Sequence, residues 1–258
     1  MAQKRFPVKE RRLHSAGESL EQELEETISD IMVMVLCATL LIAVALFEWI
    51  RLWLGLYPSK QSAIVITVIN VLLCGFVALR IRSRLRHAKN LSVGAKGEKT
   101  VGQFLETLRA KGYQVFHDIP GDGHNIDHVL IGPTGVYTIE TKTRMKPEGD
   151  ARVSYDGSEV RVNGFAPDRD PVGQALAQAR ELRAILKSST GKEFFVRPVV
   201  VYLGWYVEQP VGKKPEVWVL NEQHFVAFLD HEDVRLKDED IHLASYHLAR
   251  HVRARHDT

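Results

Sequence analysis

Two long apolar stretches stand out in the first third of the chain. Residues 31–50 read IMVMVLCATLLIAVALFEWI, and residues 63–81 read AIVITVINVLLCGFVALRI. A helix rises about 1.5 Å per residue, so about 20 apolar residues cross the roughly 30 Å of a bilayer's hydrocarbon core. The short loop between the two stretches, residues 51–62, contains Trp53 and Tyr57, which are typical of a membrane interface. The pattern predicts a hairpin of two transmembrane helices.

A cleaved signal peptide is the alternative for the first stretch. We reject this alternative because the stretch begins only at residue 31, exceeds the apolar core of a signal peptide and is followed by a second stretch. The basic residues then predict the orientation of the hairpin, because cytoplasmic loops carry an excess of Lys and Arg. The loop 51–62 holds only Arg51 and Lys60, whereas both flanks are rich in basic residues: Lys4, Arg5, Lys9, Arg11 and Arg12 before the hairpin, and Arg80, Arg82, Arg84, Arg86 and Lys89 after it.

This charge distribution predicts a multi-pass protein of the inner, cytoplasmic membrane with both termini in the cytoplasm. Residues 1–30 would form a cytoplasmic N-terminal segment, and residues 82–93 would form a basic juxtamembrane linker. The same basic linker could also bind anionic lipid headgroups or nucleic acid. A topology signal is the simpler interpretation.

The pattern changes to that of a soluble domain at Gly94. Apolar residues recur at helical spacing up to Gly112, which predicts an amphipathic helix with Glu98 in its first turn. Alternating or β-branched runs then predict strands at 113–119, 125–131, 135–141, 194–203 and 217–220, a surface hairpin at 151–164, and helices at 171–186, 222–229 and 241–255. This order predicts an α/β domain with a mixed central sheet flanked by helices over residues 94–229, followed by a charged, helical tail at 230–258.

Charge and cysteine content limit the function classes. Residues 91–258 contain 22 Lys and Arg against 24 Asp and Glu, a formal charge of −2, with nine histidines uncounted. Non-specific DNA binding normally depends on neutralising phosphates, so this balance counts against a general DNA-binding surface. The only two cysteines, Cys37 and Cys74, lie in the apolar stretches, which excludes a disulfide framework or a thiolate metal site in the soluble domain.

The residues that point to chemistry are Asp127, Glu140 and Lys142. Glu140 and Lys142 are two residues apart on a predicted strand and therefore share one face. If the segment Gly132-Pro133-Thr134-Gly135 closes a tight hairpin, Asp127 falls opposite Glu140 on the neighbouring strand. The sequence thus predicts two carboxylates and a lysine at one place.

This grouping suits a hard divalent cation such as Mg²⁺ or Mn²⁺. Mg²⁺ prefers oxygen ligands and keeps several waters, so Asp127, Glu140 and the backbone carbonyl of Thr141 would suffice as protein ligands. A bound cation acidifies water and polarises a phosphate, and the ammonium of Lys142 can orient the attacking hydroxide or stabilise developing charge. The pattern favours phosphodiester hydrolysis.

Three segments of the chain resemble a known family: GAKGE (94–98), NIDHVLIGPTGVYTIETKT (125–143) and DPVGQALAQARELRAIL (170–186). Together they are similar to the nuclease-related domain, NERD, of the PD-(D/E)xK nuclease superfamily, over about residues 94–229. The resemblance implies a restriction-endonuclease-like fold, metal ligation by Asp127 and Glu140, and a catalytic lysine at Lys142. It also implies accessory polar roles for Glu98 and Gln174. Ile126 stands where the superfamily's motif has a proline, a position that is loosely held.

Each of these residues also has an ordinary structural interpretation. Alternating charges on a strand often mark a solvated face, Glu98 suits the first turn of a helix, and Gln174 suits an exposed helix face. Three histidines, His117, His124 and His128, lie close together in the sequence but match no zinc spacing. The loop GDGHN (121–125) lacks the lysine and helix of a phosphate-binding loop.

Two functions from different classes follow. The first is a membrane-anchored, Mg²⁺- or Mn²⁺-dependent nuclease that hydrolyses DNA on the cytoplasmic side, with RNA left open as the substrate. The second is a non-catalytic module that binds nucleic acid or a protein at the membrane, which the formal charge of −2 favours. Cutting both strands would call for a homodimer, and the sequence leaves the oligomeric state open.

Overall fold

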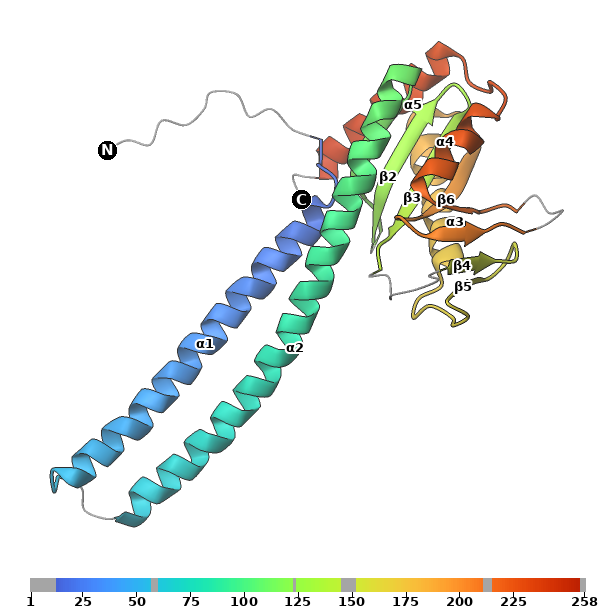
Figure 1. Ribbon diagram of the computed structural model, residues 1–258. Coiled ribbons are helices and arrows are strands. Elements are labelled where there is room, and N and C mark those ends of the chain that lie inside the picture. Colours follow the sequence, from blue (N-terminus) through green and yellow to red (C-terminus); the bar gives the residue numbers. More distant parts are fainter. Residues whose placement is uncertain (1–12, 57–59, 123, 145–151, 211–214, 256–258) are drawn as a thin grey trace, which may run out of the picture. The chain divides into compact units, whose positions relative to one another are not determined.

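The structure is a computed structural model that describes residues 13–56, 60–122, 124–144, 152–210 and 215–255 (Figure 1). It divides into two compact units, one formed by Ser19–Val93 and the other by Gly94–Thr258 together with Met1–Glu18. Several predicted segments fall partly outside the described residues: 1–12 of the N-terminal segment, 57–59 of the loop, 145–151 up to the first residue of the surface hairpin, and 256–258 of the tail.

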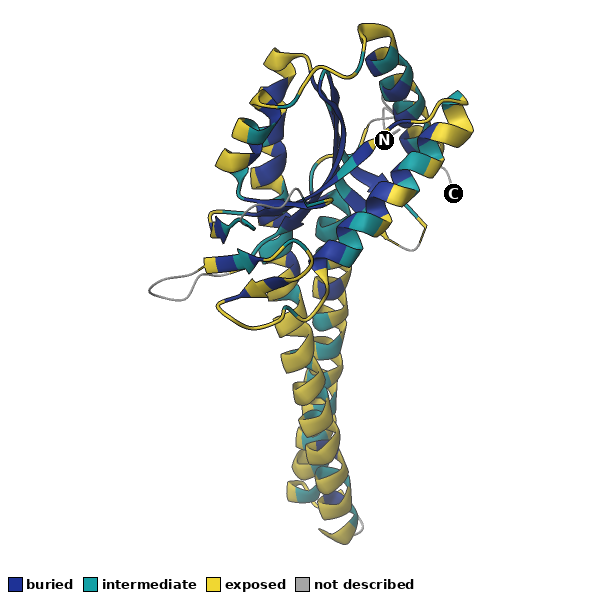
Figure 2. Ribbon diagram, turned by 90° about the vertical axis from the view of Figure 1, so that its right-hand side faces the viewer, coloured by how far each residue is buried: buried dark blue, intermediate teal, exposed yellow. Residues whose placement is uncertain are grey.

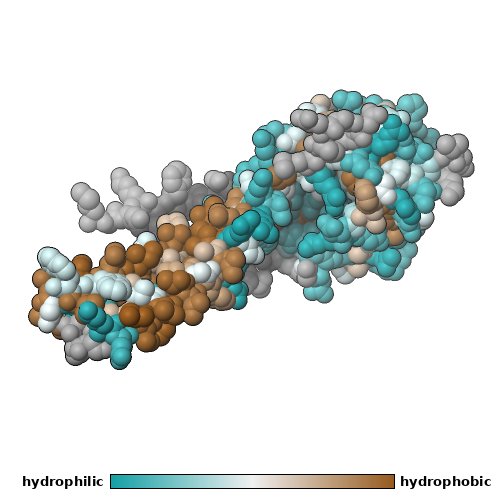
Figure 3. Space-filling view, turned by 60° about the horizontal axis from the view of Figure 1, so that its bottom comes forward, coloured by the Kyte–Doolittle hydropathy of each residue, from teal (hydrophilic) through white to brown (hydrophobic). Residues whose placement is uncertain are grey.

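The first unit is a hairpin built from helix α1 (Glu18–Trp53) and the first part of helix α2, which begins at Lys60. Its surface is hydrophobic (Figure 3), and large apolar side chains such as Met32 and Leu72 are exposed. The Trp49 Nε1–H donates to Thr67 Oγ1 across the hairpin at 2.9 Å, and Asp30 pairs with Arg84 at 3.4 Å. By length and composition, both helices could cross a membrane and form the predicted transmembrane hairpin.

Helix α2 (Lys60–Glu106) differs from the prediction. A separate linker at 82–93 and a new helix from Gly94 were expected, but one helix runs through both segments. The start at Gly94 is therefore wrong, and Glu98 does not lie in a first turn. The reason is that residues 82–93 contain no Pro or Gly and several strong helix formers. The predicted end is confirmed, because α2 passes into η1 (Thr107–Lys111) and Gly112 terminates it with a φ of 86°.

The second unit contains a five-stranded mixed sheet in the order β1-β2-β3-β6-β8. Strands β1 to β3 form an antiparallel meander, and β6 and β8 add to β3 in parallel. The strands are β1 (Gln114–Pro120), β2 (Asn125–Gly132), β3 (Gly135–Lys142), β6 (Val196–Tyr202) and β8 (Trp218–Leu220). The predicted mixed sheet of an α/β domain is confirmed.

A smaller sheet of three strands stands beside the central one, in the order β5-β4-β7. Strands β4 (Arg152–Tyr155) and β5 (Val160–Val162) form the predicted surface hairpin. Strand β7 (Tyr206–Glu208) pairs in parallel with β4 and was not predicted. Its three residues are too short for a recognisable alternation of apolar and polar positions.

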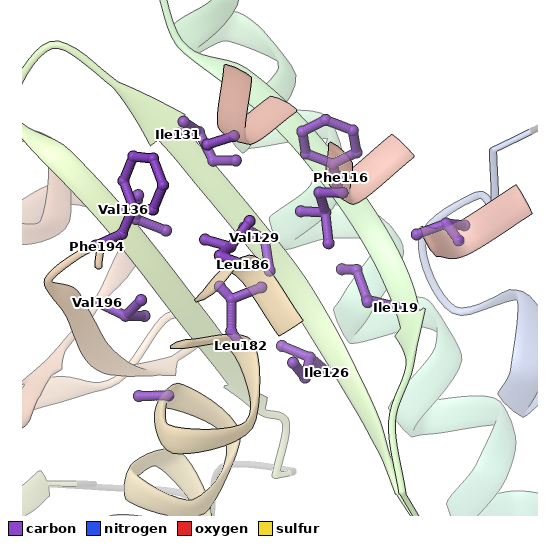
Figure 4. Close-up of a cluster of buried hydrophobic side chains, with 14 of the residues drawn as sticks. Phe116, Ile119, Ile126, Val129, Ile131, Val136, Leu182, Leu186, Phe194 and Val196 are labelled. Atoms are coloured by element: carbon purple, nitrogen blue, oxygen red, sulfur yellow. The ribbon is translucent and has the colours of Figure 1, made fainter. Parts of the chain in front are cut away.

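Helices cover both faces of the central sheet. Helix α3 (Pro171–Thr190) begins at the predicted proline, where Asp170 accepts a hydrogen bond from the Val172 amide at 3.0 Å as an N-cap. It packs with the meander in a core that includes Ile126, Val129 and Leu182 (Figure 4). The second face is covered by the C-terminal part of α2 and by α4 (Glu222–Asp230). The strands of the sheet are buried between these helices (Figure 2).

Helix α5 (Asp238–Arg255) is part of the core rather than a tail. Ile241, Ala244, Leu248 and Val252 are buried in the same cluster as the meander and α3. Their spacing of three or four residues places them on one face of the helix. The domain therefore extends beyond residue 229, where the sequence analysis ended it.

Candidate active site

The antiparallel pairing of β2 and β3 brings Asp127 and Glu140 together. His128 pairs with Ile139, so the next step of the same register places Asp127 opposite Glu140. The side chain of Asp127, on β2, is held by the backbone of the neighbouring strand β3, because the Thr141 amide donates to Asp127 Oδ2 at 2.7 Å. Both acidic residues thus lie at the end of the hairpin opposite its Gly132–Gly135 turn.

Glu140 is 3% exposed, and both of its carboxylate oxygens have partners. Lys142 Nζ donates to Oε1 at 2.7 Å, and Gln178 Nε2 donates to Oε2 at 2.5 Å. A buried carboxylate is tolerated only with such compensation, since losing hydration costs several kcal/mol. The carboxylate of Glu140 is therefore held in place by the ammonium group of Lys142 and the side-chain amide of Gln178.

Lys142 connects the sheet to α3. Its Nζ also donates to Gln174 Oε1 at 2.9 Å, and Gln174 and Gln178 project from the same face of α3 because they are four residues apart. The structure thus brings together Asp127, Glu140, Lys142 and Gln174, which the sequence analysis named as site residues. The solvated-strand interpretation of Glu140 is wrong, since its side chain is buried.

Glu98 reaches the same region from α2. The preceding residue, Gly97, is buried, and a Cβ there would overlap the Thr143 side chain, one residue after Lys142. Burial, followed by the charges of Asp118 and Glu140, raises the pKa of Glu98 to about 8. The influence of the Glu140 and Lys142 charges on Glu98 indicates that this carboxyl group lies near the end of β3, where it holds its proton at neutral pH.

The donor set can be compared with the needs of a divalent cation. Burial, then the neighbouring Glu140 and Glu98 carboxylates, raise the pKa of Asp127 well above its ordinary value. Crowded carboxylates of this kind are stabilised when a cation neutralises them. Among the described residues, no group of three or more His, Cys, Asp or Glu side chains could hold a metal ion. Two carboxylates with a backbone carbonyl and water fit Mg²⁺, which needs few protein ligands, and do not fit zinc.

Three further residues extend this arrangement and were missed in the sequence. Gln178 is fully buried, and its Nε2 donates to Glu140 and, at 3.4 Å, to the Asn125 carbonyl oxygen. The Asn125 side chain in turn donates to the buried Asp118 at 2.9 Å. Only Gln178 left a signal, because it follows Gln174 by one helical turn.

The histidines lie in different environments. His117 and His128 share a hydrogen bond between their Nδ1 atoms at 2.9 Å, whereas His124 pairs with Glu181 at 3.1 Å. Burial lowers the pKa of His128 well below its ordinary value, so this ring is neutral. His128 and Asp127 are adjacent on a strand and therefore point to opposite faces.

Comparison with known proteins gives a family match for part of the chain. The family model of the nuclease-related domain, NERD, matches residues 93–203, which contain all six predicted site residues: Glu98, Asp127, Glu140, Thr141, Lys142 and Gln174. The resemblance seen in the sequence is thereby confirmed, and it suggests a nuclease-like function.

An uncharacterized protein of Bacillus anthracis is 43% identical over 54 residues, which cover 19% of this chain and 26% of that protein. The chain thus spans about a quarter of the length of this curated relative. No solved structure matches the chain.

Proposed function

We propose that this chain is a membrane-anchored, Mg²⁺- or Mn²⁺-dependent nuclease with a restriction-endonuclease-like fold, which hydrolyses DNA on the cytoplasmic side of the membrane. The observation that carries the proposal is the group formed by Asp127, Glu140 and Lys142 at one end of the β2–β3 hairpin. The match to a nuclease-related domain supports the reaction class. The two apolar helices and the basic residues around them support the anchor and its orientation.

The proposed roles follow from the contacts of each side chain. Asp127, Glu140 and the Thr141 carbonyl would hold the cation, which supplies charge neutralisation of the phosphate and acidified water. Lys142, held between Glu140 and Gln174, keeps an ammonium group at the site that stabilises negative charge on the phosphate. Gln174 orients this lysine, and Glu98 supplies a proton-bearing carboxyl beside it. Hydrolysis adds water across one P–O bond and leaves a phosphate monoester and a hydroxyl.

The C-terminal end of helix α5 carries exposed arginines, although the formal charge of residues 91–258 is −2. Just before α5, the amides of Arg235 and Leu236 donate to the Pro133 carbonyl in the β2–β3 turn. Near its other end, His251 Nε2 lies 3.4 Å from the carbonyl oxygen of Pro120, where β1 meets the start of β2. The last turns of α5 therefore lie at the end of the sheet that carries Asp127. We propose that the exposed residues Arg250 and Arg253 contact the nucleic-acid backbone there.

The test uses the full chain, purified in detergent or reconstituted in bilayers. Plasmid, linear duplex, single-stranded DNA and RNA are incubated with Mg²⁺ or Mn²⁺. Cleavage is expected with at least one nucleic acid, and Lys142→Ala is expected to lower kcat by about 100-fold or more, because it removes a charge that stabilises the transition state.

Lys187→Ala is the matched control, since Lys187 is an exposed lysine of α3 that pairs with Glu193. It should cleave like the wild type, and a chelator should stop both proteins. Wild-type protein that is folded but cleaves nothing in either metal would contradict the proposal.

A non-catalytic binding module is the second candidate, because the formal charge of residues 91–258 is −2. Calorimetric titration of Mn²⁺ separates the two functions. A nuclease site should give a saturable signal that Asp127→Ala removes, whereas a binding module with an inert site should give none, with or without DNA.

A further inference from the structure

The residues just before α1 pack against the nuclease-related domain, although the whole hairpin separates them from it in the sequence. A Cβ added to Gly102 of α2 would come 2.6 Å from the Cβ of Ala16 and 3.3 Å from Cε1 of His117. Gly17 is buried, has a φ of 73°, and an added Cβ would come 3.1 Å from the Ala95 carbonyl oxygen. Residues 14–17, here called the arm, therefore fit closely against a part of α2 that belongs to the same compact unit.

Within the arm, His14 lies beside a buried carboxylate. Its Nδ1 is 3.8 Å from Asp118 Oδ2, and the two side chains are 15% and 2% exposed. Asp118 also has a φ of 49°, which non-glycine residues rarely adopt inside a strand. A carboxylate buried in this way needs hydrogen bonds and a compensating positive charge. His14 is positioned to contact this carboxylate from the N-terminal side of the hairpin.

A series of contacts leads from Asp118 to the candidate active site. Asp118 Oδ1 accepts a hydrogen bond from the Asn125 side chain at 2.9 Å, and Asn125 begins β2 two residues before Asp127. The Asn125 carbonyl lies 3.4 Å from Gln178 Nε2, which also donates to Glu140. The charge of Asp118 is in addition one of the causes that raise the pKa of Glu98. Asp118 thus holds the start of the strand that carries Asp127.

Capping of α1 is the simpler explanation for an ordered segment here. Ser15 N and Oγ both donate to Glu18 Oε2, at 2.7 and 3.1 Å, and the bond from the Ser15 amide is one half of a capping box. These hydrogen bonds explain why Ser15 and Glu18 are ordered. They do not explain a half-buried histidine against Asp118, or the close fit of Ala16 and Gly17 to α2.

We propose that the arm is an integral part of the nuclease-related domain and that His14 is a positioning residue of its active site, acting through Asp118 and Asn125. The hairpin is then more than an anchor appended to an independent domain. A protein cut down to residues 91–258 would lack a piece of its own site.

Docking of the arm is tested without reference to catalysis. Cys37 and Cys74 are replaced by Ala in the full chain, and a single cysteine is introduced as Ala16→Cys or as Leu13→Cys, which neighbours the arm and is 39% exposed. A soluble maleimide should label Ala16→Cys about ten times more slowly than Leu13→Cys, because labelling needs local opening of the arm. Adding His14→Ala or Gly102→Val to Ala16→Cys should raise its labelling rate toward that of Leu13→Cys.

Equal labelling rates for Ala16→Cys and Leu13→Cys in otherwise unaltered protein would overturn the docking. Where Gly102→Val impairs folding, His14→Ala decides, since it removes the contact with Asp118 and leaves α2 unaltered. Slow labelling that His14→Ala does not change would overturn the role of His14 as an anchor of the arm.

The positioning role rests on the proposed function and is tested by steady-state kinetics. His14→Ala should lower kcat by about tenfold and leave KM for DNA unchanged, because a misplaced acidic group weakens interactions made in the transition state rather than substrate binding. His14→Gln keeps a donor toward Asp118 and should retain kcat within about threefold. Leu13→Ala is the control and should match the wild type.

The two failures can be told apart. A kcat of His14→Ala equal to that of the wild type would overturn the positioning role and leave the nuclease intact. A wild type that cleaves nothing would end the proposed function, and the labelling rates would then decide the docking of the arm by themselves.

Discussion

Glu98 is a single carboxyl group whose environment opposes ionisation. Burial is the largest cause, and the charges of Asp118 and Glu140 add to it, so its pKa rises from 4.5 to about 8. Lys142 acts in the opposite direction but does not outweigh them. At neutral pH and without a cation, the folded protein therefore keeps a proton that the unfolded chain releases.

The stability of the protein should reflect this proton. Below pH 4.5 the group is protonated in both states, and between pH 4.5 and about 8 only the folded state holds the proton, so this group's contribution to stability falls as the pH rises. Glu98→Gln removes the titration. With chelator present, the loss of Tm between pH 5 and 8 should be smaller in the variant, by about 2–4 °C for each kcal/mol. Parallel Tm curves for the two proteins would contradict the raised pKa.

Gln178 is a buried amide that holds Glu140. Gln178→Ala should lower the free energy of unfolding by about 1–3 kcal/mol, because it leaves a buried carboxylate oxygen without its donor. It should also reduce kcat, since Glu140 is then free to move. Denaturant unfolding and cleavage rates check both effects. Gln103→Ala, at an exposed position of α2, is the control and should change neither.

The sequence predicted Asp127, Glu140 and Lys142 because one hairpin brings them together through local pairing. Gln178, Asp118 and His14 could not be predicted in the same way, since their contacts depend on how α3, β1 and the arm pack. Asp118 in particular becomes informative only when its burial and its partner Asn125 are known.

At the scale of elements, α5 shows how composition can hide a core helix. Histidines and arginines made residues 230–258 look like a solvated tail, but Ile241, Ala244, Leu248 and Val252 form a buried stripe. The other elements with a clear period of two or 3.6 residues were predicted within a few positions, whereas β7 was too short to recognise. The start at Gly94 failed for a different reason, because a composition change was taken for a helix boundary.

The basic end of α5 carries its own prediction. The double variant Arg250→Glu, Arg253→Glu should raise KM for DNA at least tenfold. It should also lower the slope of log binding constant against log salt concentration by about 2, because each arginine neutralises one phosphate. Its kcat should stay near that of the wild type. Arg161→Glu changes an exposed arginine of β5 and serves as the control. An unchanged KM and salt slope in the double variant would place the DNA elsewhere.

At the scale of the whole molecule, the chain segments that form the second unit restrict how the protein can cross a membrane. Residues from both sides of the hairpin, the arm and Gly94–Thr258, belong to one compact unit. A bilayer cannot pass between groups in contact such as His14 and Asp118, so a chain that crosses a membrane between them would have to cross it an even number of times. The even number of crossings follows from this contact alone, without the basic residues that predicted the orientation from the sequence.

Both ends of the hairpin should therefore lie on the same side of the membrane, and the basic flanks predict the cytoplasmic side. Fusions of a fluorescent protein and of a periplasmic phosphatase, placed before residue 1 and after residue 258 in a bacterial host, report the two locations. Fluorescence without phosphatase activity is expected at both ends, whereas a phosphatase fused in the loop 51–62 should be active. Opposite results at the two ends would exclude both the two-span hairpin and the contact between His14 and Asp118, because one crossing would then separate the arm from its domain.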